Sequence, residues 1–275
     1  MSRIDDALAQ ARTRIAPAEA RLLLAHVLDC THAWLAAHGE EAMTTQESER
    51  FAELLARRGE GEPIAHLIGY REFYGRSFAL TPQVLIPRPE TELLVELAVA
   101  KLANPAAPAI LDLGAGSGCI GVTLALEIPA ARVTAVDVSA AALDLARGNS
   151  QALAASLRLI ESDWFSALGD ERFDLVVANP PYIAENDPHL HQGDLRFEPP
   201  LALTSGADGL TAIRRIVAQA PRHLAAGGWL LIEHGYDQAE AVAALLAAAG
   251  LVDIEQHRDL AGIVRVSAAR LGDRA

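Results

Sequence analysis

Cysteine and long apolar runs are both scarce in this chain. It contains two cysteines, Cys30 and Cys119, which cannot form the disulfide framework of a small secreted domain and so favour a reducing compartment. No apolar stretch is long enough to span a membrane. The first residues, MSRIDDALAQ, include acidic ones and are not followed by the apolar segment of a signal peptide. We therefore expect a cytoplasmic protein with no membrane partner.

Positive charge is also in deficit. Aspartate and glutamate number 36 against 23 lysines and arginines, which gives a net charge of -13. Proteins that hold nucleic acid through their overall electrostatic field are basic. The composition therefore disfavours a direct nucleic-acid partner, although a local basic patch is not excluded.

What the chain does contain is enough apolar material for a large core. Its 275 residues are 51% hydrophobic, which suits one large domain or two modest ones. Apolar residues recur at helical spacing over 16–38, after Pro17 in what would be a first helical turn. A further helix is expected to have Thr45 as its N-cap and to stop at Gly59.

A change of pattern follows the helical region. Residues 67–89 are rich in aromatic and β-branched residues but are broken by Gly75 and Pro82, which predicts a short hairpin or linker. A helix is then expected over 91–103. We predict a helical N-terminal domain over 1–72, a hairpin linker over 73–90 and a second domain over 91–275.

Strands and helices alternate after Pro108. This alternation predicts a doubly wound α/β fold with a parallel sheet, whose ligands bind at the carboxyl ends of the strands. The last two strands have no helix between them, which indicates an antiparallel hairpin. The expected strands are 109–113, 132–138, 157–162, 173–178, 229–234, 252–257 and 263–268, and the helices are 119–128, 141–154, 210–224 and 238–250.

A glycine-rich turn ends the first of these strands. Gly114, Gly116 and Gly118 would let a cofactor approach the backbone closely, since side chains there would block it. Asp137, about 20 residues further on, lies where a carboxylate accepts hydrogen bonds from a ribose diol. The alternative is a tight turn that binds no ligand.

The same stretch also contains the spacing of a dinucleotide-binding loop. Gly116, Gly118 and Gly121 form G-x-G-x-x-G, but this pattern starts late, because the strand has already ended by Leu113. The earlier spacing from Gly114 fits the loop of enzymes that use S-adenosylmethionine (AdoMet) better.

The sequence Asn179-Pro180-Pro181-Tyr182 follows the fourth strand of the second domain. The nitrogen of a planar NH2 is a poor nucleophile because its lone pair is delocalised, and an enzyme can hold it with two acceptors, one for each N–H. The Asn179 side-chain oxygen and the Pro180 carbonyl can supply them, while proline has no N–H that would compete. Pro181 adds stiffness, and Tyr182 can lie flat against the substrate plane. The alternative is a proline-rich turn with a packing tyrosine.

With these motifs in this order, the chain resembles the bacterial glutamine methyltransferases that act on peptide chain release factors. The resemblance covers nearly the whole chain and rests on EPIAHLIGYREFYGRSF, VLIPRPETELLVE, DLGAGSGCIG, SDWFSAL, NPPYI, RFEP, LLIEHG and RVSAAR. It implies a seven-stranded, Rossmann-like AdoMet-dependent methyltransferase domain behind a small helical domain. It also implies methylation of the glutamine amide in the Gly-Gly-Gln motif of class 1 release factors, which would be the protein partners.

The resemblance also implies roles for individual residues. Asn179 to Tyr182 would contact the glutamine, with Asn179, Pro180 and Tyr182 catalytic and Pro181 in the substrate site. Trp164 follows an acid at a strand end, where an adenine can be stacked, and Asp163 could accept from its amino group; a plain core aromatic is the alternative for Trp164. The residues that would contact AdoMet are Gly114, Ala115, Gly116, Ser117, Gly118, Asp137, Asp163, Trp164 and Asn179.

Two further motifs and the histidines remain open. The charged residues Arg88, Glu90 and Glu92 in IPRPETE could line the methionine end of the cofactor or order the linker, or could simply start a helix. RFEP, residues 196–199, is expected to close over the site. The spacing of His189, His191 and His234 matches no common ligand pattern, so we expect no metal.

Four other functions compete with this one. The target could be a glutamine in a ribosomal protein, since the amide chemistry is identical and the N-terminal domain would choose the partner. It could be an amino group of adenine or guanine in nucleic acid, which the acidic charge disfavours. An NAD-dependent oxidoreductase would leave Asn-Pro-Pro-Tyr unexplained, and a non-catalytic AdoMet-binding adaptor would not need the amide-binding residues.

Overall fold

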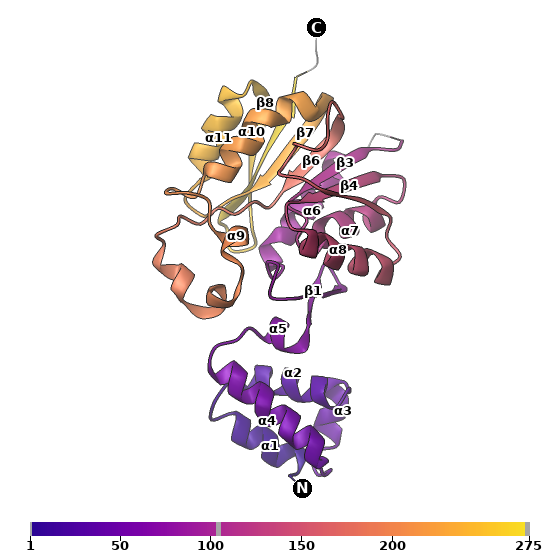
Figure 1. Ribbon diagram of the computed structural model, residues 1–275, viewed down its shortest axis with the longest axis vertical. Coiled ribbons are helices and arrows are strands. Elements are labelled where there is room, and N and C mark those ends of the chain that lie inside the picture. The colour runs from indigo at the N-terminus through magenta and orange to yellow at the C-terminus, as the bar shows by residue number, and fades with distance from the viewer. Residues whose placement is uncertain (1, 103–105, 273–275) are drawn as a thin grey trace. The chain divides into compact units, whose positions relative to one another are not determined.

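The computed structural model describes residues 2–102 and 106–272 and divides into two compact units (Figure 1). One unit extends to Tyr70 and includes His191–Phe197. The other comprises Arg71–Leu190 and the chain from Glu198 onward. The sequence-based division into 1–72, 73–90 and 91–275 stays a prediction; residues 73–90 lie within the second unit. The short segment 191–197, which lies far along the sequence, belongs with the helical unit, and the sequence did not predict this.

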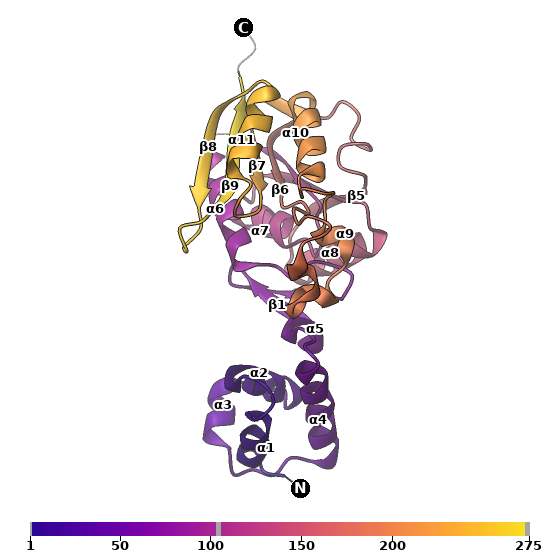
Figure 2. The ribbon, with the colours of Figure 1, turned by 90° about the vertical axis from the view of Figure 1, so that its left-hand side faces the viewer.

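The first unit is helical, and its helices surround one apolar core (Figure 2). Leu23, Leu24 and Leu54 are completely buried in that core. Pro17 opens its helix, as predicted, because its fixed φ suits the first turn and its missing N–H needs no partner there. The helices are α1 (Ile4–Ala11), α2 (Pro17–Val27), α3 (His32–Ala37), α4 (Thr45–Gly59) and α5 (Ile64–Ile68).

Helix capping corrects the sequence-based prediction at two points. The N-cap of α4 is Thr44 rather than Thr45: the Thr44 hydroxyl accepts from the Glu47 backbone, and the Glu47 carboxylate accepts from the Thr44 backbone. This reciprocal pair is a capping box, and its acid must stand three residues after the cap. The helical pattern over 16–38 is two helices, because Thr31 caps the second by accepting from the Trp34 backbone.

The second unit begins with the predicted hairpin. Strands β1 (Tyr70–Phe73) and β2 (Arg76–Ala79) form a two-stranded sheet. After the 3-10 helix η1 (Pro89–Thr91), helix α6 (Glu92–Lys101) follows, as predicted from the sequence. The end of that predicted helix, at residue 103, lies outside the described residues.

The main sheet of the second unit has seven strands in the order β5-β4-β3-β6-β7-β9-β8. The predicted parallel arrangement is confirmed for β3 to β7, and so is the antiparallel hairpin of β8 and β9. The strands are β3 (Ala109–Leu113), β4 (Arg132–Asp137), β5 (Leu157–Glu161), β6 (Phe173–Ala178), β7 (Leu224–Glu233), β8 (Leu251–Arg258) and β9 (Val264–Leu271).

Helices cover both faces of this sheet (Figure 1). Apolar residues of α6 and α7 pack with alternate strand residues such as Ile110 and Val177, while α10 packs on the other face against Leu111 and Val176. The alternation follows from the strand period of two. The helices of this part are α7 (Cys119–Glu127), α8 (Ala140–Ala152), α9 (Pro200–Leu203), α10 (Thr211–His223) and α11 (Ala239–Ala248), with the 3-10 helix η2 (Pro188–His191). The 3-10 helix η3 (Gly193–Phe197) belongs to the helical unit.

Strand register places the predicted motifs side by side. Leu113, the last residue of β3, pairs with Val136 of β4 and Ala178 of β6. The residues that come next in each strand or loop are Gly114, Asp137 and Asn179. The three predicted features therefore meet at one carboxyl edge of the sheet, at the point where the chain order reverses about β3.

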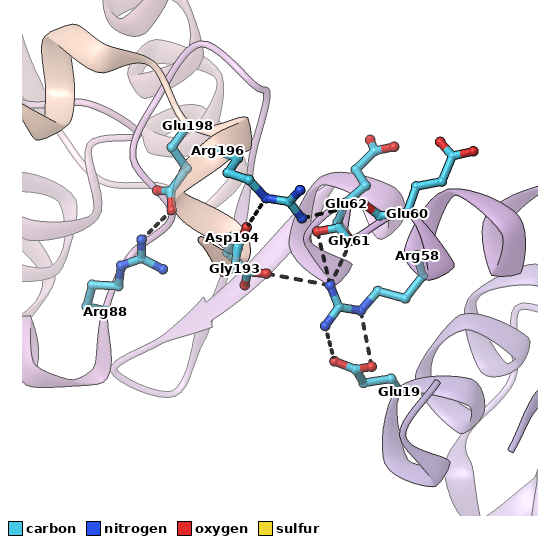
Figure 3. A network of polar contacts seen from close by, with 10 residues as sticks. All are labelled: Glu19, Arg58, Glu60, Gly61, Glu62, Arg88, Gly193, Asp194, Arg196 and Glu198. Carbon is cyan, nitrogen blue, oxygen red and sulfur yellow. Dashed lines mark hydrogen bonds and ion pairs between the residues drawn. The ribbon is translucent and has the colours of Figure 1, made fainter. Parts of the chain in front are cut away.

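Polar contacts hold the segment 191–197 in the helical unit. Arg58 pairs with Glu19 at 2.7 Å and with Asp194 at 3.5 Å (Figure 3). Arg196 donates to the backbone carbonyls of Gly193 and Glu60. A segment that follows Asn-Pro-Pro-Tyr in the sequence thus makes polar contacts with residues of the helical unit.

Candidate active site

A cavity of about 780 Å³ opens at the carboxyl edge of the sheet. Its volume is in the range of roughly 300–1,000 Å³ that is usual for small-molecule sites. Gly118, Pro180 and Tyr182 are not among its lining residues. The predicted residues that line it are Gly114, Ala115, Gly116, Ser117, Asp137, Asp163, Trp164, Asn179 and Pro181.

The glycine turn has the backbone that its composition suggested. Gly114, Gly116 and Gly118 have φ angles of +78°, +54° and +80°, which glycine adopts without the steric penalty of a side chain. A Cβ on Gly118 would also lie 3.0 Å from the Cβ of Ala146. On Gly121 it would lie 3.0 Å from Oδ2 of Asp112, so the last glycine of the dinucleotide-like pattern is explained by packing.

Asp137 is fixed by the backbone on both sides. Its Oδ2 accepts from the Gly116 N–H at 2.9 Å, and its Oδ1 accepts from the Ser139 N–H at 2.9 Å. Each carboxylate oxygen retains a second lone pair. The side chain is therefore held in place and can still accept from a pair of hydroxyl groups.

Trp164 and Asp163 lie at another part of the cavity. Trp164 has a φ of +54°, which is unusual for a residue with a side chain, and its ring packs against the main core cluster. Asp163 pairs with Arg215 of α10 at 2.7 Å, and Arg215 also lines the cavity. Two apolar side chains that the sequence analysis missed also line it: Val138 and Leu201, both largely exposed.

The Asn-Pro-Pro-Tyr segment makes two defined side-chain contacts. Asn179 Nδ2 donates to Oγ1 of Thr91 at 3.0 Å, and the Tyr182 hydroxyl donates to Oε1 of Glu233 at 3.3 Å. The Tyr182 ring packs against the core cluster, and burial beside Glu233 raises its pKa. The sequence alone did not indicate Thr91 as a functional residue, although it stands between Glu90 and Glu92 of IPRPETE.

Two buried carboxyl groups lie close to the cavity. Asp112, under the glycine turn, is completely buried, and burial raises its pKa to about 7 although the Gly121 N–H donates to it. Glu233 is 1% exposed, and burial raises its pKa to about 7 as well. Groups with such shifts are common at functional sites because burial disfavours the charged form.

The structure gives Arg88 and Glu92 structural contacts. Arg88 pairs with Glu198 of the RFEP segment (Figure 3). The Glu198 side chain is completely buried and also accepts from the Ile86 N–H at 2.9 Å. Glu92 accepts from the Tyr74 N–H at 2.8 Å, which ties the hairpin to α6. Since Pro87 and Pro199 both line the cavity, the Arg88–Glu198 pair holds two of its walls together.

Two of the three histidines considered above, His189 and His234, are held by other polar groups. His234 Nε2 lies 2.9 Å from the Ser267 hydroxyl, and His189 lies 2.7 Å from Asp187. No group of three or more potential metal ligands occurs within residues 2–102 and 106–272. Over the same residues, no helix has the length and apolar character needed to cross a membrane.

Comparison with known proteins identifies the family. Residues 1–69 match the PrmC N-terminal domain, and residues 90–193 match the Methyltransferase small domain. The release factor glutamine methyltransferase of Bordetella pertussis is 54% identical over 92% of this chain and 94% of that protein. The Escherichia coli protein of the same name is 45% identical over 92% of this chain and 91% of that protein. The chain belongs to the release factor glutamine methyltransferase family.

Solved structures agree with this family's fold. A methyltransferase from Pyrococcus furiosus covers 80% of this chain and 99% of its own, with a TM-score of 0.55 at 17% identity. The T. thermophilus 16S rRNA N2 G1207 methyltransferase, solved with AdoMet and guanosine, covers 74% of this chain and 49% of its own, with a TM-score of 0.53 at 21% identity. At such identities the likeness concerns the fold alone, and the predicted Rossmann-like methyltransferase fold is confirmed.

Proposed function

We propose that this chain transfers a methyl group from AdoMet to the side-chain amide nitrogen of the glutamine in the Gly-Gly-Gln motif of class 1 peptide chain release factors. The observation that carries the proposal is the meeting of an AdoMet-type glycine turn and Asn-Pro-Pro-Tyr at one sheet edge, in a chain of this family. Release factors act in the cytoplasm, so we propose that the chain works there too.

The cavity fits AdoMet in shape and chemistry. The positive φ angles of the glycine turn leave the backbone open to close approach. Asp137 can accept from both ribose hydroxyls, and Trp164 can stack on adenine beside Asp163. When bound, AdoMet supplies an activated methyl group, so the protein itself need provide no nucleophile.

The task of the protein is then to hold a weakly nucleophilic nitrogen. With its Nδ2 committed to Thr91, Asn179 presents Oδ1 as an acceptor. The proposed second acceptor is the Pro180 carbonyl, although Pro180 itself does not line the cavity, and the two prolines stiffen the segment before the substrate arrives. Acceptors fixed in advance lose little free energy to reorganisation when the reaction begins.

The competing functions are less well supported. The curated relatives that cover most of this chain are named as release factor glutamine methyltransferases, which favours that target over a ribosomal protein. The net charge of -13 gives no electrostatic support for nucleic acid. The packing explanation for Gly121 removes the main argument for a dinucleotide.

Label transfer tests the proposal directly. The purified chain is incubated with AdoMet labelled in its methyl group and with one substrate at a time: a class 1 release factor, the same factor with Gln→Ala in Gly-Gly-Gln, ribosomal proteins, or bulk RNA. We expect label on the unaltered release factor alone. Label on RNA or on a ribosomal protein, with none on the release factor, would contradict the proposal.

A further inference from the structure

Glu233 is a buried carboxyl group that contacts the Asn179–Tyr182 segment through the Tyr182 hydroxyl and takes no direct part in methyl transfer. Glu233 ends β7 and is 1% exposed. Its Oε1 accepts from the Tyr182 hydroxyl at 3.3 Å, while its Oε2 is buried without a hydrogen-bond partner in the described part of the chain. The Thr91 hydroxyl lies near enough to the same carboxyl to favour its charged form, and the unpartnered Oε2 is free to accept a hydrogen bond. Thr91 therefore stands between Asn179 and Glu233.

The orientation of the Asn179 amide decides whether it can hold the substrate. A substrate NH2 offers only donors along its two N–H bonds, so it needs an oxygen opposite. If the Asn179 side chain turned over, its own NH2 would face the substrate NH2. Two donors would then meet, and the acceptor would be lost.

Thr91 alone cannot set this orientation. A hydroxyl both accepts and donates, so it could accept from Nδ2 of Asn179 or donate to Oδ1. Its single hydrogen decides which. A carboxylate only accepts hydrogen bonds, so an ionised Glu233 can take the hydroxyl hydrogen through its unpartnered Oε2, which leaves the oxygen of Thr91 free to accept from Asn179.

We propose that Thr91 and Glu233 are positioning residues that together fix the Asn179 amide with its oxygen toward the cavity. This inference rests on the proposed function, because the orientation of Asn179 matters only if the amide holds a substrate. The orientation itself can be measured without any substrate. Tyr182 belongs to the same network, because its hydroxyl holds the other side of the Glu233 carboxyl. Residues from η1, from the turn after β6 and from the end of β7 thus orient one acceptor.

The network implies a pH dependence. A protonated Glu233 can donate to Thr91, and the Thr91 hydrogen is then free to turn to Asn179 Oδ1. The titratable and charged groups that act on Glu233 are Arg265 of β9, Glu90 of η1, Tyr182 and the Cys119 thiol of α7. With the pKa of Glu233 at about 7, kcat is expected to fall about tenfold between roughly pH 8 and pH 6, as for one essential ionised group.

Two substitutions test the relay. Thr91→Val keeps the shape and removes the hydroxyl, and Glu233→Gln replaces one acceptor oxygen by an NH2 donor and removes the ionisation. We expect each to lower kcat by about tenfold to a hundredfold, the usual effect of removing the partner that orients a functional side chain, with the Kd for AdoMet changed by less than about threefold. Thr91→Ser should recover most of the activity, and in Glu233→Gln the fall of kcat toward low pH should disappear.

Ser267→Ala is a matched control. It removes another fully buried hydroxyl, one that bonds His234, the neighbour of Glu233 along the chain. It should leave kcat within about twofold of the unaltered protein, because it does not contact Asn179. A kcat for Thr91→Val within about twofold of the unaltered protein, or a Glu233→Gln variant that keeps the fall toward low pH, would overturn the proposal.

A readout without any substrate separates this inference from the proposed function. The side-chain NH2 of Asn179 can be followed by NMR and assigned by its loss in Asn179→Ala. We expect one of its protons to be shifted and protected at pH 8, and to lose both properties in Thr91→Val and in Glu233→Gln. Identical resonances in the unaltered protein and in Thr91→Val would overturn the inference even if release factors are methylated. The proposed methylation of release factors is tested separately, by the label-transfer experiment.

Discussion

The two halves of the cavity are built in different ways. The half proposed for AdoMet depends on one short stretch of backbone, Gly114–Gly118, and on Asp137, which is itself held by backbone N–H groups. The half proposed for the substrate depends on side chains from three distant segments: Thr91, the Asn179–Tyr182 segment and Glu233. A local motif therefore specifies the first half, whereas the second exists only when the sheet has formed.

This difference predicts how each half fails. Backbone geometry in the glycine turn is set by φ angles that other residues adopt only with strain, so damage there is local. A network of side chains fails as a unit, because each member holds the next.

Asn179→Ala and Asp137→Ala should affect different quantities, kcat in the first case and the Kd for AdoMet in the second. Loss of the Asn179 acceptor is expected to lower kcat by about 10²–10³, as removal of one preorganised group at a reacting centre does, with little change in the Kd for AdoMet. Asp137→Ala should instead weaken AdoMet binding by about tenfold to a hundredfold, the worth of hydrogen bonds to a charged group. Calorimetric titration with AdoMet and release-factor methylation rates measure the two. If both variants changed kcat and Kd alike, the division into halves would be wrong.

The two buried carboxyl groups should make stability fall as pH rises. Burial raises the pKa of both Asp112 and Glu233 to about 7, so between roughly pH 4 and pH 7 the folded state binds more protons than the unfolded state. Asp112→Asn should remove its share: the variant should match the unaltered protein near pH 4 and exceed it by on the order of 4 kcal/mol near pH 8. Urea unfolding at both pH values checks this. An equal difference at the two pH values would contradict the assignment.

Glu198→Gln tests the ion pair that joins two walls of the cavity. The substitution leaves Arg88 without its charged partner and should lower the free energy of unfolding by about 2 kcal/mol, less than for a fully buried pair because Arg88 is partly exposed. Activity should fall mainly through kcat. Arg214→Gln, at the exposed pair with Asp208, is the control and should change stability by less than about 1 kcal/mol. A Glu198→Gln variant as stable as this control would show that the pair is not needed.

Thr44→Ala should affect neither half. It removes the side-chain cap of α4 in the helical unit and should lower stability by about 1 kcal/mol. The Kd for AdoMet should be unchanged. A loss of AdoMet affinity in this variant would mean that the helical unit supports the cavity directly.

The sequence predicted most of the fold because hydrophobic periodicity and punctuation are local. The glycine turn and the end of β3 at Leu113 could be anticipated from composition alone. Thr45 was mistaken for the cap because two adjacent threonines look equivalent until the position of Glu47 is considered. Thr91 was missed because a threonine inside an acidic helix start carries no signal; only the fold brings it to Asn179.

The inclusion of His191–Phe197 in the helical unit restricts how the chain can be divided. A shortened chain that begins at Arg71 would leave Asp194 without Arg58, and Arg196 without the Glu60 carbonyl. The freed segment lies between Tyr182 and Glu198 in the sequence, so its disorder would reach both sides of the substrate half. In chimeras between relatives, the N-terminal helices and residues 191–197 should therefore be exchanged together, so that their contacts are kept.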